Sequence, residues 1–173
     1  ILFPTVFYLD RGLAWQVTIA KALALRGHQV TFMPLDIHFP RRNALYFDEQ
    51  DWGFITSYYN LYTKTLLKNF GLVVEPYSQF GSAQKFEEYR RQVRHLDATG
   101  CRQFTYHHLP LGQMVINPLI HYFRCGPQTM NQTILGAYQD YLAIGMVLYD
   151  VISTALDTLH PDIIFTLNGS FLD

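Results

Sequence analysis

The chain has 173 residues, of which 49% are hydrophobic and 16% are charged. These proportions fit one folded domain over residues 1–173 and exclude disordered and collagen-like classes of protein. The net charge of −1 gives no general attraction to nucleic acid, and two cysteines are too few for a disulfide scaffold. A reducing, cytoplasmic setting is therefore the expectation.

The first 36 residues have the pattern strand, helix, strand, which opens a parallel α/β sheet. An apolar run, ILFPTVFYL, ends at Asp10-Arg11-Gly12, and an amphipathic stretch then runs to Gly27, a residue suited to a left-handed helix end. Spacings of three and four predict one face packed on the sheet and a polar remainder. The packed face is Leu13, Val17, Ala20 and Ala24, and the polar remainder is Gln16, Thr18 and Lys21.

The middle of the chain predicts a helix over 54–70, a short buried strand over 72–74 and a helix over 82–96 that ends at Ala98-Thr99-Gly100. The apolar track of the 82–96 helix consists of Phe86, Tyr89, Val93 and Leu96. Its outer face is basic and carries Arg90, Arg91 and Arg94. The default interpretation of this basic face is a solvated surface. An anionic sugar polymer or a membrane surface is the alternative.

The last third predicts a short strand and then a turn within 103–112, which includes His107-His108, followed by helices over 113–124 and 128–159. A final strand over 163–167 leads to Asn168-Gly169-Ser170. Because the first residue already lies in a strand and the last lies where a helix would begin, we expect a portion of a longer protein. No run of about 18 uncharged apolar residues occurs, so we expect no transmembrane segment, while peripheral membrane contact stays open.

Polar residues follow three predicted strands at the edge where parallel strands end, and ligands bind at this edge in such sheets. Asp10 is placed to act as a general base or to cap the first helix. Arg11 and Gly12 suit an anion, and His38 follows the second strand as a base or a phosphate ligand. Each is equally explained as an ordinary loop or turn residue.

After the last strand, Asn168, Gly169 and Ser170 are suited to binding sugar hydroxyls, although Asn-Gly is also a common turn dipeptide. The sequence lacks the motifs typical of dinucleotide binding, nucleoside triphosphate binding, serine hydrolysis and zinc binding. The chain has no Gly-x-Gly-x-x-Gly, no Walker lysine motif, no Gly-x-Ser-x-Gly and no zinc-ligand spacing. We therefore expect no metal site.

The chain resembles the N-terminal lobe of a GT-B glycosyltransferase, a fold with a Rossmann-like parallel sheet flanked by helices in each of two lobes. The resemblance lies in Arg26-Gly27-His28-x-Val30, which leads into the second strand, and in His160-Pro161-Asp162-Ile163-Ile164-Phe165 at the last strand. These segments are similar to the family patterns LxxRGHxV and xxPDhhh. Leu109-Pro110-Leu111-Gly112 and the long helix resemble bacterial enzymes of surface-polysaccharide biosynthesis.

The resemblance implies a lobe that binds a sugar or glycan acceptor, with Asp10 at the position of the catalytic base. A C-terminal lobe would bind the nucleotide-sugar donor, no further cofactor would be needed, and the N-terminal lobe would be inactive alone. One feature departs from the family, because the loop after the first strand has one glycine, Gly12, where many members have two. The alternatives are a sugar-nucleotide epimerase of the same fold and a non-catalytic α/β domain that binds a ligand or a protein.

Overall fold

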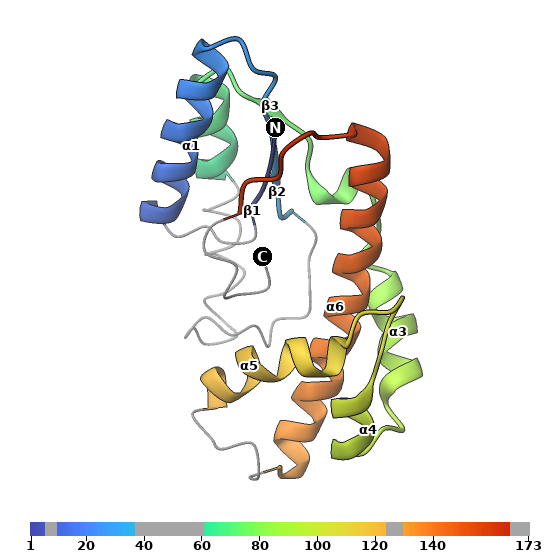
Figure 1. The fold of residues 1–173 in the computed structure, drawn as a ribbon. Helices are drawn as coiled ribbons and strands as arrows, with labels where there is room; N and C mark the ends of the chain where they lie inside the picture. The colour runs from blue at the N-terminus through green and yellow to red at the C-terminus, as the bar shows by residue number, and fades with distance from the viewer. Residues whose placement is uncertain (6–9, 37–60, 124–129, 167–173) are drawn as a thin grey trace.

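The computed structural model describes residues 1–5, 10–36, 61–123 and 130–166, and the statements below concern those residues. Residues 61–69 are helical in addition to the labelled elements (Figure 1). The labelled elements are β1 (Leu2–Thr5), α1 (Asp10–Leu25), β2 (Thr31–Pro34), β3 (Val73–Val74), the 3₁₀ helix η1 (Tyr77–Gln79), α3 (Lys85–Val93), α4 (Ala98–Gln103), α5 (Leu111–Phe123) and α6 (Gln132–Leu159).

The described strands form a parallel sheet in the order β1-β2-β3, which confirms the α/β class. Leu2 pairs with Thr31 in β2, and on its other side it forms a parallel bridge with Ile164. The backbone N–H of Leu2 donates to the carbonyl of Ile163, and that of Phe165 donates to the carbonyl of Leu2, each at 2.8 Å. The segment from Ile163 to Phe165 therefore extends the sheet beyond β1.

Each strand sends alternate side chains to opposite faces of the sheet, as the strand period of two requires. Phe3 and Phe32 stack on one face with ring centroids 5.0 Å apart, in the cluster that holds α1 and the 61–69 helix. Leu2 and Met33 point to the other face, where they join the cluster around α6. Helices thus cover both faces of the sheet (Figure 1).

Helix α1 confirms the predicted packed face, because Leu13, Val17 and Ala20 are buried against β1 and β2. Two details differ from the prediction. The helix begins at Asp10, so residues 10–12 are its first turn rather than a loop before it. Gln16, which the prediction assigns to the polar remainder, is buried, because it lies three residues after Leu13 and four before Ala20 and so shares their face.

Helix α6 is the centre of the second cluster and is buried all round from Ala137 to Leu148. Asn131 caps its start by accepting from the N–H of Ile134, and His160 ends it in the left-handed conformation. By length and composition α6 is apolar enough to cross a membrane, with a mean hydropathy of 1.5, yet half of that stretch is buried inside the protein. The core helix of a folded domain has the same kind of composition, and α6 packs against α3, α4 and α5.

Helices α3, α4 and α5 pack around α6, and the predicted apolar track of α3 is confirmed by the burial of Phe86, Tyr89 and Val93. The segment from Ala98, which the sequence assigns to a helix end, instead begins α4. Asp97 caps that helix by accepting from the N–H of Gly100 at 2.7 Å. The short strand predicted within 103–112 is also wrong, since Gln103 ends α4, whereas the predicted turn is present between Tyr106 and Leu109.

The contact between α4 and α5 depends on a glycine. A Cβ at Gly112 would overlap the carbonyl oxygen of Cys101 and lie 2.7 Å from that of Arg102, and both of these are backbone atoms that cannot move aside cheaply. The carbonyl oxygen of Gly112 also accepts a hydrogen bond from the buried hydroxyl of Tyr138 at 2.7 Å. Gly136, by contrast, has open space where its Cβ would lie.

These two glycines predict opposite results for the same substitution. Gly112→Ala should lower the free energy of unfolding by about 1–3 kcal/mol, because it forces α5 away from α4. Gly136→Ala should raise it by up to about 1 kcal/mol, since alanine is the better helix former and meets nothing. Urea unfolding of both variants measures the difference. Equal effects of the two substitutions would show that α4 and α5 do not approach so closely.

Candidate functional site

The sheet has a topological switch point beside β1. The chain goes from β1 outward to β2 and β3, and α6 then returns it to the opposite side of β1 at Ile164. The order is therefore β3, β2, β1 and the Ile163–Phe165 segment, which corresponds to one half of a doubly wound sheet. In such sheets the ligand lies outside the carboxyl ends of the strands at this point.

The predicted site residues at the end of β1 start helix α1. Asp10, Arg11 and Gly12 are its first turn, five residues after β1 ends at Thr5. The N–H groups of a first helical turn have no acceptor within the helix, and they favour an anion. The side chains of these three residues are outside the described part of the chain, so the base role of Asp10 stays a prediction.

The other predicted site residues also lie outside the described residues: His38, Asn168, Gly169 and Ser170. The described polar group at the end of β2 is Asp36. One of its carboxylate oxygens accepts from the N–H of Ser78 at 2.8 Å and the other accepts from the Ser78 hydroxyl at 2.6 Å. Asp36 therefore holds the end of β2 against η1 and has a structural role.

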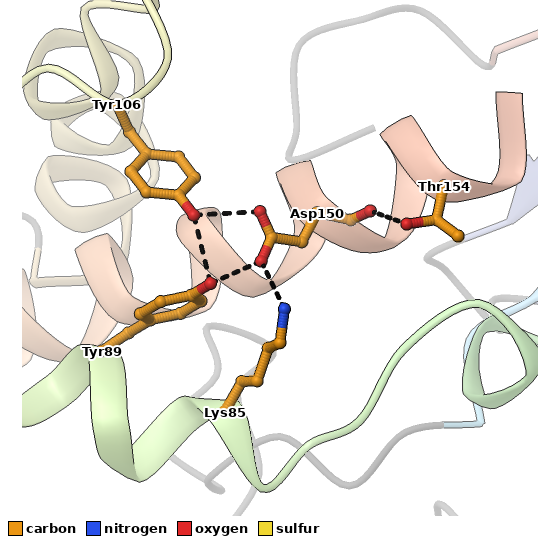
Figure 2. A network of polar contacts seen from close by, with 5 residues as sticks. All are labelled: Lys85, Tyr89, Tyr106, Asp150 and Thr154. Atoms are coloured by element: carbon orange, nitrogen blue, oxygen red, sulfur yellow. Dashed lines mark hydrogen bonds and ion pairs between the residues drawn. The ribbon is translucent and has the colours of Figure 1, made fainter. Parts of the chain in front are cut away.

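A second polar cluster lies between α3, α6 and the turn after α4 (Figure 2). Asp150 of α6 is its centre. Lys85 lies 3.0 Å from Asp150 Oδ2, and the hydroxyl of Tyr89 donates to the same oxygen. Tyr106 Oη lies 2.9 Å from Asp150 Oδ1 and 3.1 Å from Tyr89 Oη. The Tyr106 hydroxyl can therefore donate its one proton to either oxygen.

The protonation states of this cluster are fixed by its own contacts. Burial raises the pKa of Asp150, but the hydrogen bonds from Tyr89, Lys85 and Tyr106 outweigh it and the net pKa is lowered. Burial and the hydrogen bonds to its neighbours raise the pKa of Tyr106 far above its ordinary value. The hydrogen bond to Asp150 raises the pKa of Lys85. These directions favour an ionised Asp150 beside a charged Lys85 and an uncharged Tyr106, and we call this cluster of Lys85, Tyr89, Tyr106 and Asp150 the clamp.

The turn beside this clamp holds two residues in the left-handed region, His107 with φ 45° and His108 with φ 72°. Tyr106 and Leu109 close the turn by exchanging backbone hydrogen bonds of 3.0 and 2.9 Å. The ring of His107 stacks on Tyr149, with centroids 5.0 Å apart and planes 6° from parallel. Such strain costs on the order of 1–3 kcal/mol per residue, and this ring packing offsets part of it.

Sequence reasoning missed the clamp because its members are spread over the 65 residues from Lys85 to Asp150 and share no motif. The one available signal was a charged residue, Asp150, within two positions of the apolar track of α6 at Leu148 and Ile152. Among the described residues, no three His, Cys, Asp or Glu side chains gather as a metal site would require.

No family model matches the chain, and no curated protein and no solved structure matches it significantly. Any functional assignment therefore depends on the sheet order, on the residues at the strand ends and on the chemistry of the side chains.

The clamp predicts a pH-dependent stability. The folded state lowers the pKa of Asp150 below its ordinary value of 3.8, so its contribution is present above that value and disappears as the pH falls through the lowered pKa. At pH 7, Asp150→Asn should lower the free energy of unfolding by about 1–2 kcal/mol, since hydrogen bonds to a charged acceptor are lost. The gap to the wild type should shrink as the pH falls below about 4.

Urea unfolding at a series of pH values measures this gap. Asp157→Asn is the matched control, because Asp157 lies on the same helix and is exposed. A gap for Asp150→Asn that stays constant down to the lowest pH would contradict the ionised clamp.

Proposed function

We propose that the chain is the N-terminal, acceptor-side lobe of a GT-B glycosyltransferase. The observation that carries the proposal is the pairing of β1 with Ile164. It puts the His160 to Phe165 motif directly beside the strand that leads to Asp10. On the other side of β1, the Arg26-Gly27-His28 turn leads into β2, and Gly27 takes a φ of 88°, which favours glycine.

In this proposal the loops at the switch point form one wall of an acceptor cleft. Asp10 takes the proton of an acceptor hydroxyl while that oxygen forms a bond to the anomeric carbon of the donor sugar. The bond from this carbon to the donor's diphosphate oxygen breaks, and the nucleoside diphosphate leaves. Arg11 and the N–H of Gly12 stabilise negative charge, as positive groups and helix N-termini do elsewhere.

The remaining predicted residues have binding roles. In the sequence, His38 comes shortly after β2, and Asn168, Gly169 and Ser170 come shortly after the segment that pairs with β1 at Ile164, so both groups follow chain segments next to the switch point. Their side chains and backbone N–H groups are suited to acceptor hydroxyls. The nucleotide sugar is held mainly by a second lobe in this proposal.

The test is Asp10→Asn in the full-length protein. Loss of a general base should lower the rate of sugar transfer by roughly 10²- to 10⁴-fold, without a matching loss of thermal stability. Transfer is measured as release of the nucleoside diphosphate in the presence of an acceptor. Asp162→Asn is the control, because Asp162 precedes the neighbouring strand at its amino end, away from the proposed site.

Transfer that survives Asp10→Asn unchanged would remove Asp10 from the reaction. Turnover of the nucleotide sugar without any acceptor would instead favour the epimerase, and no turnover or binding of any nucleotide sugar would favour a non-catalytic domain.

A further inference from the structure

The three arginines of the basic face near the end of α3 have different surroundings. Arg90 Nε lies 2.7 Å from the carboxylate of the buried Asp140, and Arg90 also pairs with Glu87. Arg91 donates to the backbone carbonyl of Glu87. The guanidinium of Arg94 makes no ion pair or hydrogen bond to the described residues. The basic face is therefore not uniform, and Arg94 is its available cation.

Arg94 lies on a cleft of about 420 Å³ between the connection from α3 to α4 and the first two turns of α6. This volume falls in the range of small-molecule sites. Leu96 and Leu135 give the cleft an apolar wall, and they are partly buried against the core. Gly136 also lines it and leaves open space where a side chain would lie.

A buried carboxamide provides the second polar group of the cleft. Gln139 lines the cleft and is only 5% exposed. Its Nε2 donates to the carbonyl oxygens of Arg94 and Leu96, at 3.2 and 2.9 Å. Because both partners are acceptors, the amide orientation is settled. The carbonyl oxygen Oε1 has no donor among the described residues and is not one of their buried unsatisfied atoms, so it is an accessible acceptor for a ligand that donates.

We infer that this cleft binds a small anionic polyol, such as a phosphorylated or carboxylated monosaccharide. The anion pairs with Arg94, a hydroxyl donates to Gln139 Oε1, and the C–H groups of the ring lie on Leu96 and Leu135. Asp97 also lines the cleft, and its carboxylate already caps α4, so the anion is expected at Arg94 and not near Asp97. His95 lies next to Arg94 and adds a second donor.

This site is separate from the proposed acceptor cleft. It lies at the N-terminal end of α6 beside α4, whereas the C-terminal end of α6 leads into the sheet (Figure 1). Binding of a ligand in this cleft is therefore independent of the glycosyltransferase proposal.

Binding is tested by isothermal titration of the whole protein with glucose 6-phosphate and with glucuronate. Saturable binding of either supports the inference, and the better of the two identifies phosphate or carboxylate as the anion. Glucose and inorganic phosphate, each carrying half of the recognised chemistry, should bind at least tenfold more weakly. Inorganic phosphate that binds as tightly as the sugar phosphate would overturn the role of Gln139, and no saturable binding of either anionic sugar would overturn the site.

Two variants test the location. Arg94→Ala should weaken binding at least tenfold, whereas Arg91→Ala, which changes an arginine three residues away that does not line the cleft, should leave it within twofold. Gly136→Leu should weaken binding at least tenfold by filling the cleft. Its melting temperature is measured beside that of Gly136→Ala, whose Cβ meets no atom within 4 Å, so that loss of the cleft is distinguished from loss of the fold. Equal binding by the wild type, Arg94→Ala and Gly136→Leu would place the ligand elsewhere.

Discussion

The burial of α6 is the constraint on which the rest of the structure depends. A helix that is covered all round from Ala137 to Leu148 needs partners inside the protein for the polar groups that it buries. The amide nitrogen of Gln139 donates to the carbonyls of Arg94 and Leu96, and Asp140 binds Arg90. Further along, Asp150 on the edge of the covered surface binds Lys85, Tyr89 and Tyr106. All three ties involve α3 or the segments that follow it.

These polar contacts fix the direction in which α3 lies along α6. Apolar packing between the two helices contributes further stabilising free energy. Removing Arg90 alone would leave the carboxylate of Asp140 buried without a partner, a situation that costs on the order of 3–5 kcal/mol. The core then continues from α6 into the sheet through Leu2 and Met33, which belong to the same cluster. One helix thereby supports both the helical layer and one face of the sheet.

Much of the fold follows from local pattern. The structure contains the helices that the sequence predicts at α1, α3 and α6. They are predictable because apolar residues spaced three and four apart mark the face of a helix that packs on the core. Helix α4 is not predictable in this way, since six residues with one cap carry almost no periodic signal. The turn at His107-His108 also escapes prediction, because a left-handed histidine is rare and depends on packing against Tyr149.

The site is less predictable than the fold. The strand ends can be found from sequence, because parallel strands share an edge, and that reasoning selects Asp10 and the residues after the last strand. The different surroundings of Arg90 and Arg94 cannot be predicted from the sequence. The two residues are one helical turn apart on the same face, but Arg90 pairs with Asp140 of α6 and with Glu87, whereas Arg94 lies on the open cleft beside Gly136.

Native-state hydrogen exchange tests most directly whether α6 belongs to one cooperative core. The backbone amides from Ala137 to Leu148 and those of β1 and β2 should exchange only through global unfolding, with the same free energy of opening. Helix α4, which is short and mostly exposed, should open at lower cost. If the amides of α6 exchanged at a clearly lower free energy than those of β1 and β2, the helical layer and the sheet would be separate units, and the central role of α6 would be contradicted.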